Sequence, residues 1–114
     1  MDKILIGYAR VSTLDRQELE LEAQIRKLKR FGCKKIYSEK ESGSKDQRKE
    51  FQKAVRYAKR MALIKNKSVF LIVLKLDRLS RSTRTLLNVV EDLEESSIHL
   101  HSMSEQSWVW NRQG

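Results

Sequence analysis

The chain has 114 residues, of which 39% are hydrophobic, and it carries a net charge of +9. This size fits one domain with a single core, and the apolar content is that of a folded protein rather than a disordered one. No apolar stretch approaches the ~20 residues of a membrane span, the N-terminus lacks the apolar region of a secretory signal, and the single cysteine, Cys33, excludes an internal disulfide. We therefore expect a cytoplasmic protein. Its basic surplus favours a polyanionic partner such as nucleic acid, with a lysine-rich solvated surface as the alternative.

Strand and helix patterns alternate along the chain. In chain order, the sequence predicts a strand at 4–7, a helix at about 16–31, a strand at 35–37, a polar loop at 38–46, a helix at about 49–63, a strand at 69–74, a helix capped by Ser82, and a strand at 98–101. Strands separated by helices of this length favour right-handed crossovers between parallel strands. We therefore expect a three-layer α/β fold, with helices on both sides of a mostly parallel sheet of about four strands.

Apolar residues at helical spacing predict the inward side of each helix. The expected inward residues are Leu21, Ile25 and Leu28 in the first helix, Phe51, Ala54, Val55, Ala58, Met61 and Ala62 in the second, and Leu86, Leu87, Val90 and Leu93 in the third. Gly32 is expected to end the first helix as a left-handed C-cap, with Cys33 buried or at the boundary beside it. His99 and His101 share one face of the last strand, and without a third ligand they do not indicate a metal site.

Polar segments follow two of the predicted strands directly. Tyr8–Thr13 follows the first strand, and Lys75–Arg81 follows the third. The carboxyl ends of strands are where open α/β sheets bind ligands and place chemistry. A serine in such a position is, by itself, more often a helix N-cap or a turn residue. The two segments together favour a polar site built around Ser12 and several arginines.

With a middle element at Glu41–Arg48, these two segments resemble the catalytic domain of the serine recombinases, the resolvase and DNA-invertase family. The three elements occur in the family's order and spacing over roughly the first hundred residues. The resemblance implies a resolvase-like fold and a site-specific recombinase that cuts and rejoins DNA through a 5′-phosphoserine. It also implies DNA as the partner, no cofactor or metal, and assembly of dimers into a synaptic tetramer.

The resemblance assigns a role to each matching position. It implies Ser12 as the nucleophile, Arg10, Arg48, Arg78 and Arg81 as the groups that stabilise phosphate charge, Asp77 and Tyr8 as supporting catalytic residues, and Ser42, Gly43 and Lys75 as contacts to DNA phosphate. Phosphoryl transfer needs charge stabilisation on the non-bridging oxygens, and the planar fork of arginine supplies it without a metal. For Lys75, a charge at a strand end is an equal alternative.

The resemblance stops near the C-terminus. Residues 1–103 are expected to form the catalytic domain, and residues 104–114 read as a tail unlike the family. We expect no DNA-binding module in this sequence, because a helix-turn-helix does not fit in the residues that remain, and we expect the long helix of the family's dimer interface to be absent as well. The alternative function is therefore an inactive remnant that interacts with full-length recombinase subunits. A flavodoxin-like phosphate binder is disfavoured because no glycine-rich phosphate loop is present.

Overall fold

The computed structural model describes residues 2–12, 17–41, 48–64, 67–76 and 83–104. Its seven elements are β1 (Asp2–Ser12), α1 (Gln17–Phe31), β2 (Lys35–Glu41), α2 (Lys49–Ala62), β3 (Lys67–Val73), α3 (Thr83–Glu95) and β4 (Ile98–Ser102). The four strands form one sheet in the order β2-β1-β3-β4, and every pairing in it is parallel. Strands and helices alternate as the sequence predicts.

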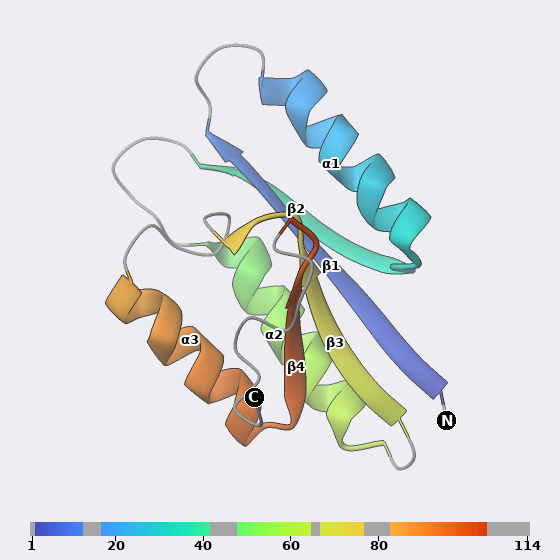
Figure 1. Ribbon diagram of the computed structural model, residues 1–114, viewed down its shortest axis with the longest axis vertical. Helices are drawn as coiled ribbons and strands as arrows, with labels where there is room; N and C mark the ends of the chain where they lie inside the picture. The colour runs from blue at the N-terminus through green and yellow to red at the C-terminus, as the bar shows by residue number, and fades with distance from the viewer. Residues whose placement is uncertain (1, 13–16, 42–47, 65–66, 77–82, 105–114) are drawn as a thin grey trace.

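The sheet lies between two helical layers (Figure 1). Helix α1 covers one face, while α2 and α3 cover the other. The chain moves from β1 to β2 in one direction across the sheet and from β2 past β1 to β3 in the other. Right-handed crossovers in opposite directions place their helices on opposite faces. The predicted three-layer α/β fold is therefore confirmed.

The two faces have separate cores of different size. The larger core joins the sheet to α2 and α3 and contains Ile6, Tyr8, Phe51, Ala54, Ala58, Val69, Leu71, Val73, Leu86, Val90, Leu93, Ile98 and Leu100. The smaller core, under α1, contains Ala9, Leu28, Cys33 and Ile72. Helix α1 approaches the sheet closely at Gly7, where an added Cβ would lie 3.2 Å from Leu28 Cδ1.

The first two strands are longer than predicted. The sequence places the end of the first strand at Gly7 and a polar loop from Ser38, but β1 continues to Ser12 and β2 to Glu41. The two segments pair with each other from Ile6↔Lys35 to Ser12↔Glu41. The prediction failed here because polar residues at a strand end were interpreted as loop, whereas each segment supplies the hydrogen-bonding partner of the other.

The helix boundaries agree with those predicted from the sequence to within about a turn. The prediction was wrong for one inward residue. Leu87 is 41% exposed, whereas the other inward positions of α3 are buried. Gly32 has a φ of 119°, and its N–H donates to Lys29 O while Cys33 N–H donates to Leu28 O. These two bonds form the Schellman ending of α1, so the C-cap prediction is confirmed. Cys33 is buried, and burial raises the pKa of its thiol to about 11.

Candidate active site

The candidate site lies beside β1, at the point where the strand order of the sheet reverses. Strand β1 stands between β2 and β3, and the chain leaves β1 toward β2 on one side and reaches β3 on the other. The carboxyl end of such a strand borders the crevice where open α/β sheets bind ligands. Tyr8 and Arg10 lie on the same face of β1, two residues apart, and Tyr8 belongs to the core under α2. Ser12 is the last residue of this strand.

Glu39 of β2 connects the end of β1 to the start of α2. Its carboxylate accepts a hydrogen bond of 2.5 Å from the Tyr8 hydroxyl, and it accepts the backbone N–H groups of Glu50 and Phe51 at 3.2 Å each. These are the second and third N–H groups of α2, which a helix N-cap side chain usually satisfies. The residue at the N-cap, Arg48, makes no such side-chain bond. Glu39 therefore caps the helix from the neighbouring strand.

The charged groups at this end of β1 act on the phenol of Tyr8. The pKa of Tyr8 is strongly raised, first because the side chain is buried and then because of the hydrogen bond and negative charge of Glu39. The positive charges of Arg10 and Arg48 oppose this rise. Two guanidinium groups from different elements are thus within electrostatic reach of one phenol. Tyr8 is a neutral hydrogen-bond donor here.

Arg10 is only 6% exposed, which is unusual for a charged side chain. Its backbone carbonyl accepts a 3.3 Å hydrogen bond from Gln24 Nε2, so α1 holds the strand from the opposite face. Gln24 is 1% exposed, and in the described part of the chain its Oε1 has no hydrogen-bond partner.

Arg48 adopts a left-handed backbone conformation, with φ 47° and ψ 51°. Non-glycine residues pay on the order of 1–3 kcal/mol for this region, and they retain it where the surroundings enforce it. Here the Glu39 cap fixes the first turn of α2 directly after Arg48. The Arg48 guanidinium carbon lies 6.0 Å from the centre of the Phe51 ring. The Arg48 side chain thus lies near a ring that itself packs edge-on against Tyr8.

The structure brings together part of the predicted site. Tyr8, Arg10 and Arg48 form one cluster at the carboxyl end of β1, next to the backbone of Ser12. Lys75 lies elsewhere: it is exposed and lines a hollow on the α1 side of the sheet. The other predicted residues lie outside the described residues, namely Ser42, Gly43, Asp77, Arg78 and Arg81.

Two polar residues of this site, the buried Gln24 and the partly buried Glu39, were missed from the sequence. Gln24 lies on the apolar stripe of α1, between Leu21 and Leu28, and a polar residue in such a stripe is a detectable signal. Glu39 was assigned to a polar loop. Its partnership with Tyr8 depends on the pairing of β1 with β2 and on the position of α2, so no local pattern indicates it.

Among the described residues, no group of three or more histidine, cysteine, aspartate or glutamate side chains is placed to hold a metal ion. No helix in the described ranges combines the length and hydropathy needed to cross a bilayer. His99 and His101 do share a face of β4, where they contact the rings of Phe70 and Phe31, respectively.

Comparison with known proteins gives a consistent result. The family model described as the resolvase N-terminal domain matches residues 5–113. The chain is 35% identical over 100 residues to the DNA-invertase hin of Salmonella typhimurium, covering 88% of this chain and 47% of that protein. It is 38% identical over 100 residues to the transposon Tn552 resolvase of Staphylococcus aureus, covering 88% of this chain and 46% of that protein. The chain therefore spans less than half the length of these relatives.

Solved structures show the same fold. The N-terminal catalytic domain of TP901-1 integrase matches with a TM-score of 0.69 and 28% identity, covering 91% of this chain and 78% of that one. A serine recombinase from Sulfolobus solfataricus also matches with a TM-score of 0.69, at 23% identity, covering 90% of this chain and 69% of that one. The second match, at this low identity, supports the fold alone.

Proposed function

The chain belongs to the resolvase N-terminal domain family, and we propose that it carries the strand-cutting chemistry of a site-specific DNA recombinase with Ser12 as nucleophile. The observation that supports this most directly is the cluster of Arg10 and Arg48 around Tyr8, at the strand end that Ser12 occupies. Two guanidinium groups held at the carboxyl end of β1 suit a phosphodiester, because each presents a rigid fork of donors to phosphate oxygens.

The proposed step is a reversible displacement at phosphorus. Ser12 Oγ attacks the scissile phosphate, its proton passes to a base, and the bond from phosphorus to the 3′ oxygen breaks. The 3′ oxygen takes up a proton and leaves as a hydroxyl, while the 5′ phosphate stays on the serine. The covalent bond retains the phosphodiester energy, so rejoining is the same reaction in reverse and needs no external energy source.

Charge on the non-bridging oxygens is the main obstacle to this step. Arg10 and Arg48 are proposed to stabilise it, together with Arg78 and Arg81. Glu39 holds Tyr8 and the start of α2, so it keeps Arg48 in position without touching substrate.

The remaining family positions keep their predicted roles as proposals. Asp77 would orient an arginine or accept the serine proton, Ser42 and Gly43 would contact DNA phosphate and shape the segment before Arg48, and Tyr8 would hold Arg10 or contact phosphate. Residues 1–103 are proposed as the catalytic domain, followed by the tail at 104–114. DNA is the proposed substrate, and dimers and a synaptic tetramer are the proposed assembly.

The test is to trap a detergent-resistant protein–DNA adduct on supercoiled plasmid. The wild-type chain is expected to form one, and Ser12→Ala is expected to form none. Ser96→Ala, at the end of α3 and far from β1's carboxyl end, is the matched control and should behave as the wild type. After nuclease and protease digestion, the peptide that contains Ser12 should carry the mass of a 5′-linked nucleotide.

The arginines give a second, graded readout of the same assay. Arg10→Lys keeps the charge but removes the planar fork, so it is expected to slow adduct formation by roughly 10²–10³, as the loss of one preorganised donor does. An adduct that persists in Ser12→Ala, or that forms on another residue, would contradict the assignment of the nucleophile. The absence of an adduct from the wild-type chain would contradict a working catalytic site in this chain.

A further inference from the structure

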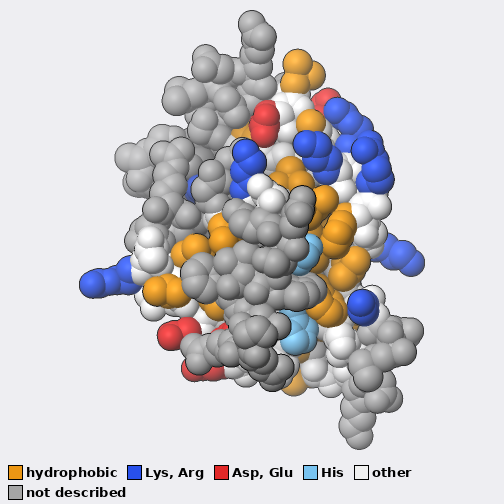
Figure 2. Space-filling view, in the orientation of Figure 1, with side chains coloured by type: hydrophobic (Ala, Val, Ile, Leu, Met, Phe, Trp, Pro, Cys, Tyr) orange, Lys and Arg blue, Asp and Glu red, His pale blue; other side chains and the backbone are white. Residues whose placement is uncertain are grey.

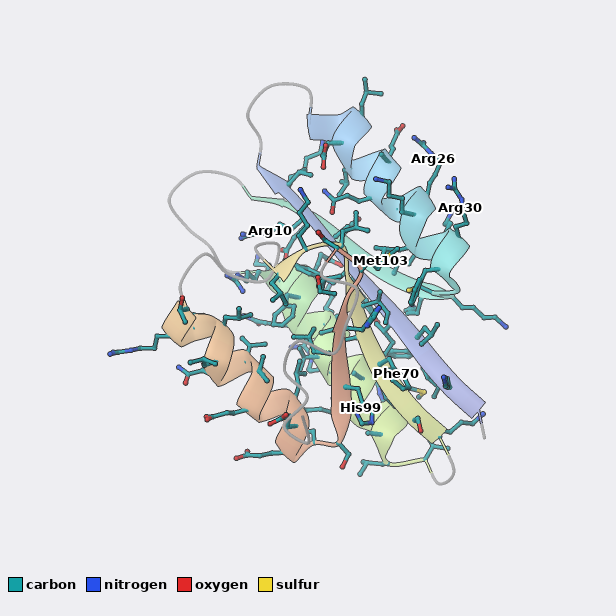
Figure 3. The ribbon with its side chains drawn as sticks, viewed as in Figure 1. Arg10, Arg26, Arg30, Phe70, His99 and Met103 are labelled. Atoms are coloured by element: carbon teal, nitrogen blue, oxygen red, sulfur yellow. The ribbon has the colours of Figure 1, made fainter. Side chains whose placement is uncertain are left out.

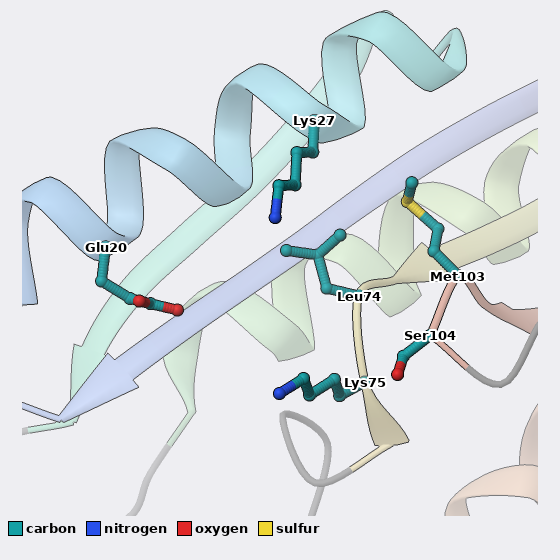
Figure 4. Close-up of a pocket in the computed structure, with 6 residues that line it drawn as sticks. All are labelled: Glu20, Lys27, Leu74, Lys75, Met103 and Ser104. Carbon is teal, nitrogen blue, oxygen red and sulfur yellow. The ribbon is translucent and has the colours of Figure 1, made fainter.

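A second polar feature lies at the same edge of the sheet, on the α1 side. It is a hollow of about 370 Å³ lined by Glu20, Lys27, Leu74, Lys75, Met103 and Ser104. These residues come from α1, from the segment that follows β3, and from the end of β4 (Figure 4). The Arg10 and Arg48 cluster belongs to the other side of the sheet, under α2. The hollow is therefore separate from the candidate active site but shares its edge.

Two lysine side chains enter this hollow from different elements. Lys27 extends down from α1, and Lys75 reaches in from the segment after β3 (Figure 4). Within the described ranges, neither ammonium group has an ion-pair partner. The one carboxylate of the lining, Glu20, already accepts a hydrogen bond of 3.3 Å from Gln24 Nε2. Two like charges that share a hollow with one engaged carboxylate leave a net positive site, which favours an anion.

The rest of the lining fits a sugar attached to that anion. Leu74 and Met103 form an apolar wall, and Ser104 adds a hydroxyl that donates and accepts hydrogen bonds. The wall is held firmly, because Met103 N–H donates to Val73 O at 2.8 Å and Ser104 N–H donates to Leu74 O at 2.7 Å. A bare phosphate ion would use the ammonium groups alone. A sugar–phosphate unit would use the wall as well.

The positive charge continues from the hollow across the outer surface of α1. Figure 2 shows lysine and arginine side chains gathered over this helix, and Figure 3 shows Arg26 and Arg30 projecting away from the sheet. Arg26, Lys29 and Arg30 are exposed and, within the described part of the chain, form no ion pair. The helix dipole alone favours cations in the last turn, but it does not account for Lys75, which belongs to a different element.

We propose that Lys27 and Lys75 form a second binding site for the DNA backbone, which holds a sugar–phosphate unit outside the cut position and leads onto the basic face of α1. The proposal rests on the function proposed above, since it takes DNA as the substrate. It adds a contact on the opposite side of the sheet from the arginine cluster. A DNA strand held on both sides of this edge of the sheet would be fixed in position at the end of β1.

The test measures noncovalent binding of the 114-residue chain to a duplex of about 30 base pairs as a function of salt, with every protein carrying Ser12→Ala. Lys27→Gln and Lys75→Gln are made singly and together. The matched control, Lys34→Gln with Arg56→Gln, removes the same charge from exposed residues, one at the amino end of β2 and one on α2. A further variant, Glu20→Gln, removes the negative charge from the hollow.

Each phosphate contact contributes roughly 0.9 to the slope of log K against log salt, so the double variant should lower that slope by about 1.8. Its affinity near 0.1 M salt should fall by roughly fivefold to tenfold per lysine, whereas Glu20→Gln should bind more tightly. A double variant that matches the control in slope and affinity would overturn the proposal.

This outcome is independent of the adduct assay. Loss of the second site would leave the chemistry of Ser12 untouched, and failure of the adduct assay would leave the binding slopes measurable.

Discussion

The two faces of the sheet differ in how they are covered and in what they carry. Helices α2 and α3 together cover the first face over all four strands, and the polar cluster of Tyr8, Arg10, Glu39 and Arg48 forms at its edge. On the second face, α1 covers mainly β1 and β2. Phe70 of β3, His99 of β4 and Met103 just after β4 lie where no helix among the described residues crosses the sheet on this side (Figure 3).

This difference indicates where the fold can fix buried charged groups in position. A buried cation and a strained backbone are costly, so they persist where a large apolar core fixes the elements around them. The face under α2 and α3 provides that core, and the arginine cluster forms beside it. The thinner layer under α1 supports an open hollow with exposed lysines instead.

The largest expected effect is on the free energy of unfolding, when one phenylalanine on each face is replaced by alanine. Phe51 is 8% exposed and lies edge-on to Tyr8 with ring centres 5.1 Å apart, whereas Phe70 is only partly buried. Phe51→Ala should lower the free energy of unfolding by about 3–5 kcal/mol, because it leaves a cavity in the larger core. Phe70→Ala should cost clearly less, and denaturant unfolding measures both. Equal losses would contradict the difference between the faces.

A smaller effect is expected at the carboxylate that joins the strands to α2. Glu39→Gln keeps the shape but removes the charge that accepts from Tyr8 and from two helix N–H groups. We expect a loss of about 1–2 kcal/mol in unfolding free energy, in the range of an N-cap deletion. Adduct formation should fall further than stability explains, since Arg48 loses its support. Glu22→Gln, on the exposed face of α1, is the control and should change neither quantity.

The smallest expected effect is on the pH dependence of the unfolding free energy, and it comes from His101. Burial lowers the pKa of His101, whose ring is stacked on Phe31 with centres 5.4 Å apart. The unfolded chain therefore binds a proton near the ordinary value of 6.5 while the folded chain resists it, so stability is present above that pH and is lost as the pH falls below it. His101→Gln should flatten the fall in unfolding free energy between pH 7 and 5. His99→Gln should keep the wild-type profile, and a flattening there as well would contradict the role of His101.

The sequence predicted most of the fold because its signals are local. The apolar spacing in α1 and α2, the central strand at 69–74 and the turn at Gly32 each follow from residues close together in the chain. The extent of β1 could not be predicted this way, since Tyr8–Ser12 is a strand only because β2 pairs with it. Leu87 was placed inward because its residue type fits a core, while its actual exposure depends on what covers α3.

The sequence by itself determined the strand–helix order, the inward faces of the helices and the segments in which the proposed chemistry is located. Those properties depend on periodicity and on short motifs, which local physical chemistry sets. Only the tertiary structure decided that Glu39 caps α2 and holds Tyr8, that Gln24 supports Arg10 from the opposite face, and that Lys75 lies with Lys27 rather than with Arg10 and Arg48. Each of these partnerships joins residues that are distant in the chain. Strand pairing and helix crossover decide which of them meet.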